Sequence, residues 1–332
     1  MFENSLRSHT STTPHRWAVL RAASLLAGAW VGIAADATAQ ALVDQVRGQI
    51  QSARLGAGYA QIINLSATPD LGAANYTVRG TGTGPDLSLD LFRVPYQSHW
   101  AALSPDTDVY WRLSAGYLRM KQFLPALDAG VDSRWTAASA TGGVLAKMRL
   151  GYGVTLEPAL DLGLARLENK AGYQGAAGAL RPALDGLLFN WQTDAWIATP
   201  SLAIAWVQAT EGQTLSLRAH VARSWIKSFD ATDRVQEFSE AANIYSLRAE
   251  YARASGLRVF ERPLDWIVYS GYAGFFGANK DVLGFDAVAE IGGGLEWPLA
   301  AESLQPRRLR VTAGYFGGHS VRGWNVGLNF VY

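Results

Sequence analysis

Apolar and polar residues alternate along residues 283–297 of this 332-residue chain. The odd positions, from Leu283 to Trp297, carry no polar side chain, whereas the even positions include Asp286 and Glu290. Because successive side chains of a β-strand point to opposite faces, this segment predicts a strand with one apolar and one polar face. A strand of about fifteen residues is longer than most strands of globular proteins, and it fits a tilted strand of a transmembrane barrel.

The same alternation recurs elsewhere, most clearly in 143–154, 214–221, 244–251 and 309–316. Tryptophan and tyrosine often stand at the ends of these segments, as the aromatic girdles of a membrane barrel require. Fourteen segments are strand candidates: 56–65, 73–81, 86–94, 108–121, 133–153, 158–168, 186–197, 200–209, 213–227, 241–253, 263–275, 283–297, 307–317 and 321–332. The first two are the weakest. We therefore expect an all-β, antiparallel transmembrane barrel of about twelve strands, with fourteen as the alternative, since strand numbers are usually even.

One connection conflicts with the count of fourteen. If Tyr332 lies at the periplasmic end, the long loop 169–185 also falls on the periplasmic side, where turns are short. We therefore expect one strand in the middle of the count to be wrong.

Composition excludes several other classes of protein. The chain has no cysteine, so disulfide scaffolds and cysteine-based metal sites are excluded, and 49% hydrophobic with 17% charged residues argues against disorder. A periplasmic β-sandwich would also alternate, but the polar positions are mostly Gly, Ser, Thr and Ala, which suits a packed lumen better than a solvated face. The three histidines after residue 39 have no metal-ligand spacing, so we expect neither a metal nor another cofactor.

Residues 1–39 are typical of a cleaved signal peptide. Arg16 and Arg21 precede the apolar stretch Ala22–Ala35, and Ala37-Thr38-Ala39 supplies a small-residue cleavage site. An apolar stretch of about fourteen residues is too short for a transmembrane helix. Removing residues 1–39 leaves equal numbers of basic and acidic residues, which gives no basic footprint for nucleic acid.

Residues 40–55 are expected to form a short helix or linker before a barrel domain at 56–332. Within Ala41–Arg54, four apolar residues fall on one stripe at helical spacing: Val43, Val46, Ile50 and Ala53. Two roles remain open for this segment, a plug inside the lumen and a frayed N-terminal linker.

The last eight residues carry a specific pattern, polar-x-Gly-x-x-aromatic-x-aromatic, ending on Tyr332. The pattern is similar to the signal by which the barrel-assembly machinery recognises outer-membrane barrels. Its defining positions are Asn325, Gly327, Phe330 and Tyr332. The alternation predicts that the apolar residues from Trp324 to Tyr332 share one lipid-facing side.

Several stretches together resemble one known family. These are 91–96 (Leu-Phe-Arg-Val-Pro-Tyr), 155–164, 262–266, 283–286, 290–296 and 321–328. They are similar to solitary outer-membrane autotransporter-like β-barrel domains. The resemblance implies a barrel of twelve strands with an N-terminal helix, no passenger domain, and the outer membrane of a Gram-negative bacterium as its location. The family carries no settled catalytic role, so no site residue is transferred.

Charged residues on the polar faces are the candidate lumen-lining set: Lys147, Arg149, Arg218, Arg248, Glu250, Asp286, Glu290 and Arg310. They would either set the ion selectivity of a narrow path or pair with one another and fill the lumen. We expect a structural barrel or a small or plugged porin-like channel, not an enzyme. The alternative is a barrel enzyme acting on lipid or lipopolysaccharide, with His220 between Ser216 and Ser224 as its candidate residues. The expected partners are outer-membrane lipids and, during biogenesis, the barrel-assembly machinery.

Overall fold

The computed structural model describes residues 43–44, 46–48, 55–67, 74–78, 87–126, 129–259, 261–277, 280, 283, 285–299 and 308–331. The predicted signal peptide at 1–39 and Tyr332 lie outside these residues. The strands are β1 (Ala74–Val78), β2 (Leu87–Ser104), β3 (Thr107–Ala126), β4 (Ala129–Gly151), β5 (Val154–Gln174), β6 (Trp191–Thr210), β7 (Gln213–Phe229), β8 (Ser239–Val259), β9 (Arg262–Phe276), β10 (Ala287–Pro298), β11 (Arg308–Gly317) and β12 (Val321–Val331). The helical elements are α3 (Gly56–Ala67), η1 (Gly175–Leu180), α4 (Arg181–Leu184) and η2 (Arg234–Gln236).

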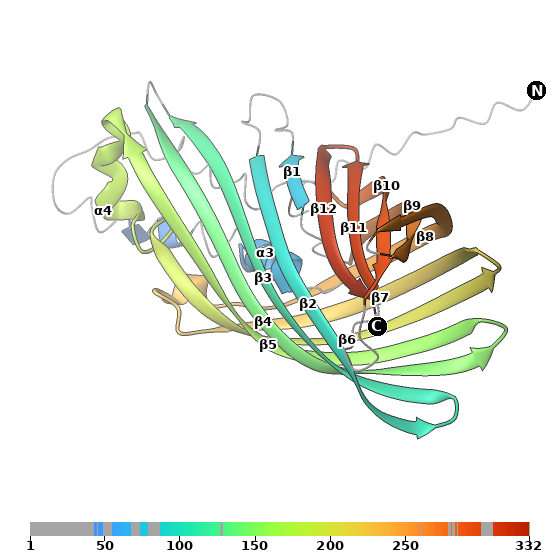
Figure 1. Ribbon diagram of the computed structural model, residues 1–332. Helices are drawn as coiled ribbons and strands as arrows, with labels where there is room; N and C mark the ends of the chain where they lie inside the picture. Colours follow the sequence, from blue (N-terminus) through green and yellow to red (C-terminus); the bar gives the residue numbers. More distant parts are fainter. Residues whose placement is uncertain are drawn as a thin grey trace, which may run out of the picture.

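Within the described residues, twelve strands form one closed antiparallel barrel (Figure 1). Each strand pairs with its neighbours in chain order, and β1 closes the barrel by pairing with β12. The prediction of an all-β antiparallel barrel with a short N-terminal helix is confirmed. No helix in the described part of the chain is long and apolar enough to cross a bilayer.

The strand predicted over 56–65 is wrong, because these residues belong to helix α3. Every residue of α3 after Gly56 is buried. A helix that is surrounded on all sides has no polar stripe, so the helical period that reveals a surface helix is missing. The adjacent β-branched residues Ile62 and Ile63 then imitate a short buried strand.

The two strands predicted over 186–197 and 200–209 are one strand, β6. Pro200 suggested a break, but the β6–β7 register steps directly from the pair Ala198–Trp225 to the pair Ser201–Ala222. The missing N–H of Pro200 therefore falls at a gap in that ladder, while Pro200 still lies opposite Leu160 on β5. This merger and the helix at 56–67 together reduce fourteen candidates to the twelve strands of the barrel.

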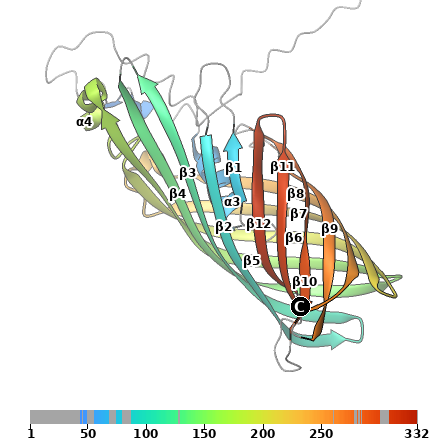
Figure 2. The ribbon, with the colours of Figure 1, turned by 45° about the horizontal axis from the view of Figure 1, so that its top comes forward.

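The two rims of the barrel differ in their connections. The turns 105–106, 152–153 and 211–212 contain two residues each and lie at one end, the short-turn rim. The connections 175–190 and 230–238 lie at the other end, the long-loop rim. Because 186–197 and 200–209 form one strand, the long connection between β5 and β6 lies at the rim opposite the two-residue turns. The conflict that the count of fourteen strands produced is thereby removed. The strands also differ in length, from 23 residues in β4 to 5 in β1, and one side of the barrel extends well beyond the other (Figure 2).

The apolar positions of the alternating strands face outward. On β10, Ile291 is 69% exposed, whereas Glu296 is only 3% exposed and points into the lumen. On β12, Trp324, Val326 and Leu328 are exposed on the outer face. The strand predicted from residue 283 begins only at Ala287. Its two leading apolar residues, Leu283 and Phe285, are buried in the hydrophobic core instead.

Candidate functional site: the lumen and its plug

Helix α3 occupies the half of the lumen nearest the long-loop rim (Figure 1). Its Tyr59 packs against two wall residues, with ring centroids 5.6 Å from Trp135 and 4.8 Å from Trp191. Ile62 and Ile63 are fully buried. Burial of a side chain of this size contributes roughly 1.5–3 kcal/mol, so the apolar contacts of α3 favour a fixed position in the lumen.

The C-terminal end of α3 is held by a wall arginine. The last carbonyls of a helix lack partners within the helix. Arg93 of β2 supplies donors to them: its Nε donates to the Ser66 carbonyl at 3.2 Å, and its Nη2 donates to the Leu65 carbonyl. Gly116 of β3 permits this approach, since a Cβ at that position would overlap the Ser66 carbonyl. Further up the helix, Asn64 accepts a hydrogen bond of 2.7 Å from Ser224 on β7.

We call the contacts of Arg93, Gly116 and Ser224 with α3 the seat of the helix, and two substitutions test it. Arg93→Met removes the donors to two buried carbonyls, and each buried unsatisfied group costs about 1–3 kcal/mol. Gly116→Leu places a side chain where the helix end lies. We expect both variants to form the barrel but to expose α3 to added protease, with a lower melting temperature. Gly172→Ala is the matched control because a Cβ there meets nothing. Wild-type protection of α3 in both variants would contradict this account of the seat.

The long-loop rim is closed over the helix by apolar residues of the connection 175–190. Leu184, Leu188 and Phe189 are buried in the same core cluster as Tyr59. Gln236 of η2 is fully buried and ties the second connection to the first, since its Nε2 donates to the carbonyls of Gly186 at 3.0 Å and Leu187 at 2.7 Å. The mouth is therefore a packed cap and not a set of independent loops.

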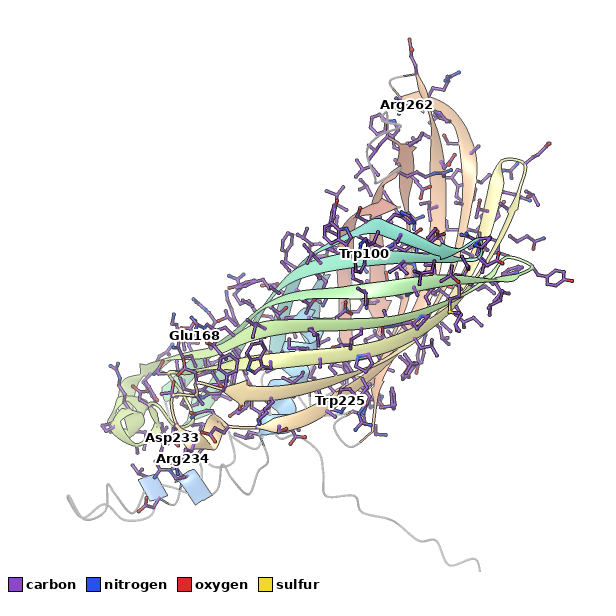
Figure 3. The ribbon with its side chains drawn as sticks, turned by 90° about the horizontal axis from the view of Figure 1, so that it is seen from below. Trp100, Glu168, Trp225, Asp233, Arg234 and Arg262 are labelled. Atoms are coloured by element: carbon purple, nitrogen blue, oxygen red, sulfur yellow. The ribbon has the colours of Figure 1, made fainter. Side chains whose placement is uncertain are left out.

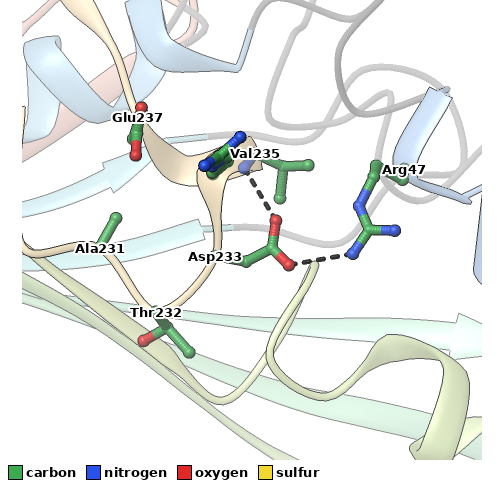
Figure 4. A pocket seen from close by; sticks show the side chains of 7 residues that line it. Arg47, Ala231, Thr232, Asp233, Val235 and Glu237 are labelled. Carbon is green, nitrogen blue, oxygen red and sulfur yellow. Dashed lines mark hydrogen bonds and ion pairs between the residues drawn. The ribbon is translucent and has the colours of Figure 1, made fainter.

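Residues 43–44 and 46–48 are helical and lie beside the connection 230–238. Arg47 pairs with Asp233 at 3.0 Å, and Asp233 also accepts a hydrogen bond from the Val235 N–H (Figure 4). Together with neighbouring residues they line an open cavity of about 480 Å³. Of residues 41–54, the described Val46 is buried in the core cluster and Arg47 pairs with Asp233, and the choice between a plug and a linker stays a prediction.

Two carboxylates of the cap carry lowered pKa values. Burial raises the pKa of Asp185, but hydrogen bonds from Asn190, Arg181 and Tyr173 outweigh it and hold that pKa below its ordinary value. Burial likewise raises the pKa of Asp233, but the hydrogen bonds from the Val235 N–H and Arg47 outweigh burial and hold that pKa below its ordinary value.

These shifts predict that acid loosens the cap. A carboxylate whose pKa is lower in the folded state stabilises that state fully above its unfolded pKa, near 3.9. The stabilisation is lost as the pH falls through the folded value. We expect cleavage within 175–190 and 230–238 by an acid-active protease to rise sharply below about pH 4. In Asp185→Asn the first connection should already be cleaved at neutral pH by a protease that is active there, while the wild type resists it. Cleavage that is independent of pH in the wild type would disprove the link.

The half of the lumen nearer the short-turn rim is lined by ion pairs. Arg112 Nε donates to Asp161 at 2.6 Å. Arg310 lies between two carboxylates, at 2.9 Å from Glu296 and 2.8 Å from Glu250. Of the eight predicted charges, Arg149, Arg218, Glu250 and Arg310 form ion pairs across strands. The choice between a filled lumen and an ion-selective path stays a prediction.

The remaining predicted lumen residues have distinct places. Arg218 pairs with Glu157 at 3.1 Å, and Arg248 pairs with Glu250 at 3.4 Å while lying over the Tyr269 ring. Lys147 lies over the Tyr110 ring, and Arg149 pairs with Asp108 at the short-turn rim. Glu290 accepts a hydrogen bond of 2.7 Å from Asn325. Asp286 is the exception, because it precedes β10, is exposed, and takes part in none of the ion pairs found among the described residues.

The proposed assembly signal is only partly described. Asn325 points into the lumen, where it contacts Glu290 and accepts a hydrogen bond of 3.2 Å from Tyr269. Gly327 lies opposite Thr312, and the backbone of Phe330 lies opposite Leu309. The role of these residues in assembly stays a prediction.

Four residues that line the lumen were not predicted from the sequence: Arg93, Arg112, Asp161 and Glu296. A signal for Arg93 was present, since it stands in phase with the inward-facing Leu89 and Leu91. Nothing in the sequence indicated that its partners would be the carbonyls of a helix. The described residues hold no cluster of three side chains suited to a metal ion.

Comparison with known proteins gives the family. Residues 87–257 match the solitary outer membrane autotransporter β-barrel domain. The chain belongs to this family. No curated protein matches it. Among solved structures it is similar to the β domain of the Bordetella autotransporter BrkA (13% identity, 78% of this chain and 98% of that one, TM-score 0.48). It is also similar to the translocator domain of NalP from Neisseria meningitidis (9% identity, 89% and 99%, TM-score 0.48) and to the transport unit of AIDA-I from Escherichia coli (10% identity, 83% and 97%, TM-score 0.48).

Membership places this autotransporter-type barrel in the outer membrane of a Gram-negative bacterium. In such barrels the short turns face the periplasm and the longer loops face outward. The short-turn rim is therefore periplasmic and the long-loop rim extracellular. It follows that α3 and the cap fill the extracellular half of the lumen, and that the ion pairs line the periplasmic half.

Proposed function

We propose that this chain is an integral outer-membrane barrel that carries no passenger domain and that is closed by its own helix. It serves as a structural barrel or a plugged channel. The observation that carries the proposal is the seat of α3, in which every residue after Gly56 is buried and Arg93 binds the helix end. The capped extracellular mouth supports the same conclusion.

The ion pairs of the periplasmic half are consistent with a closed resting state. Glu296 is only 3% exposed and is bound by both Arg308, at 2.6 Å, and Arg310. Breaking a buried pair by removing one partner leaves an uncompensated charge, which is strongly unfavourable. These side chains therefore resist moving aside for an ion. The outer-membrane lipids and the barrel-assembly machinery are the proposed partners, with no role for nucleic acid.

Planar-bilayer recording of the full mature chain tests the proposal. We expect no steady current beyond the leak of the bare membrane, because the helix and cap block the path. A reproducible open conductance from the folded full chain would overturn the plugged state. Folding is checked by the heat-dependent migration that intact membrane barrels show on a gel.

Enzymatic activity on lipid is the weaker candidate. His220 is buried on the lumen wall, and the hydroxyl of Ser224 is hydrogen-bonded to Thr199 at 2.9 Å and to Asn64 of α3. A serine used to hold the plug and enclosed within the barrel has no access to an acyl chain in the membrane. We expect no fatty acid release when the folded protein is incubated with lipopolysaccharide. Release that disappears in His220→Ala would establish the enzyme instead.

A further inference from the structure

A groove of about 510 Å³ lies on the outer face of the barrel, across β5 to β8. Its floor contains the small residues Ala198 and Ala241, and its walls include Leu162, Trp196 and Trp225 (Figure 3, Trp225). The strand register places Leu162, Ala198, Trp225 and Ala241 opposite one another in a single row. The groove is therefore formed by two large rings standing beside small residues on an otherwise continuous apolar surface.

The groove lies where the outer face changes from apolar to charged. Toward the periplasm, the outward residues of β5 and β6 are apolar, including Leu160, Leu202 and Ile204, each more than 40% exposed. Toward the extracellular rim, beyond Leu164 and Trp196, the outward positions carry Arg166 and Asp194, which pair with each other at 2.7 Å. Tryptophan prefers this interfacial depth. The groove is thus at the level where acyl chains of the outer leaflet meet their headgroups.

Lys227 places a positive charge at the extracellular end of the groove. It lies opposite Trp196 in the β6–β7 register and opposite Ser239 in the β7–β8 register. Within the described part of the chain it forms no ion pair, in contrast to Arg166. Arg223, two residues from Trp225 on its periplasmic side, has its guanidinium 5.6 Å from that ring, so among the described residues that line the groove Lys227 alone supplies positive charge at the extracellular end. Glu240 also lines the groove, but its register partner Ile226 is a buried residue on the lumen side.

We propose that this groove binds the lipid A portion of lipopolysaccharide, with one acyl chain between Trp196 and Trp225 and a phosphate on Lys227. The occupant must be apolar over the length of the groove and anionic at the end where Lys227 lies. Lipid A of the outer leaflet combines acyl chains with phosphates at that depth. A charge-assisted bond between an ammonium group and a phosphate is the strong kind of hydrogen bond, and the long lysine side chain reaches the headgroup level while its stem stays against apolar surface. This site is independent of the state of the lumen.

Native mass spectrometry of the folded full chain in detergent tests the site, with diphosphorylated lipid A and phosphatidylglycerol as separate probes. We expect lipid A to bind with one preferred stoichiometry and more tightly than phosphatidylglycerol. Lys227→Gln should weaken lipid A binding about tenfold, the loss of one charge-assisted bond. Ala241→Trp fills the floor of the groove and should abolish preferred binding.

Matched controls distinguish the groove from general attraction to the surface. Lys121→Gln removes an exposed lysine from the outer face of β3, and Ala138→Trp adds a ring to the outer face of β4. Both should bind lipid A as the wild type does. Equal binding of the two lipids, an unchanged Lys227→Gln, or equal weakening by Lys121→Gln would overturn the proposal. A protein dimer that is lost in Ala241→Trp, with no bound lipid, would assign the groove to a second copy of the chain and would also overturn it.

Discussion

Deletion of residues 40–67 is expected to turn a closed barrel into one that conducts ions. The deletion removes α3, the helix whose residues after Gly56 are all buried inside the extracellular half of the barrel. The cap loses support at the same time, because Leu184, Leu188 and Phe189 pack in the cluster that contains Tyr59. Planar-bilayer recording should show discrete openings from the deletion variant and none from the full chain.

We expect the barrel to stay folded without α3 because the contact between helix and wall leaves several buried polar groups without hydrogen-bond partners in the described part of the chain. The side-chain amide of Gln61 is buried and has no hydrogen-bond partner among the described residues, and the same holds for the hydroxyls of Ser114 and Ser139. Buried polar groups without partners cost free energy and offset part of the apolar burial. Loss of α3 removes Gln61 itself and would allow water to reach the hydroxyls of Ser114 and Ser139, so the wall of the emptied lumen remains stable.

A shorter deletion provides the control. Removal of residues 40–54 alone takes away Arg47 and its pair with Asp233 but leaves α3 in place. This variant should stay as closed as the full chain. If it conducts as well as the longer deletion, the segment before α3 closes the barrel. If neither conducts while both are folded, the cap and the ion pairs block the path without help from α3.

The alternation of apolar and polar residues was enough to predict the barrel. In β10 and β12 the period of two separates lipid-facing from lumen-facing residues, because the two environments demand opposite polarity at every step. Ile291 and Glu296 illustrate this, one exposed outside and the other buried inside. The same logic identified part of the inward charges, such as Arg218, Glu250 and Arg310, but not Arg112 or Asp161. It did not predict that Arg310 would lie between Glu250 and Glu296, because pairing depends on register across strands that are distant in sequence.

Three errors have physical causes that lie beyond local pattern. α3 lacks a solvent-facing stripe because the barrel wall surrounds it. Its sequence therefore does not show the 3.6-residue repeat of apolar and polar residues by which a surface helix is recognised. Pro200 is tolerated inside β6 because the ladder to β7 has a gap there. Leu283 and Phe285 continue the alternation before β10 but enter the core of the extracellular rim, so Asp286, which follows them and is exposed, is not a lumen residue. Each outcome was decided by a tertiary contact.

The C-terminal strand carries the second large expected effect. Replacing Phe330 and Tyr332 together with Ser should prevent insertion into the outer membrane. The exposed outer face of β12 includes Trp324, Val326 and Leu328, and the alternation predicts that the two aromatic residues continue it. Their loss removes about 2 kcal/mol of apolar contact each, a cost that a barrel of this size can survive. A complete failure to insert would therefore reflect lost recognition by the assembly machinery.

Asn329→Ser is the matched control because it alters the same strand without removing an apolar residue. Its backbone lies opposite Arg310 in the β11–β12 register, so pairing of the last two strands is retained. We expect this variant to reach the outer membrane, while the double variant collects in the periplasm or is degraded. Membrane fractionation combined with heat-dependent gel migration measures both outcomes. Wild-type amounts of folded double variant in the outer membrane would show that the terminal aromatic residues are not the signal. Equal loss of Asn329→Ser would show that the strand is merely sensitive to change, since β12 closes the barrel through its pairing with β1.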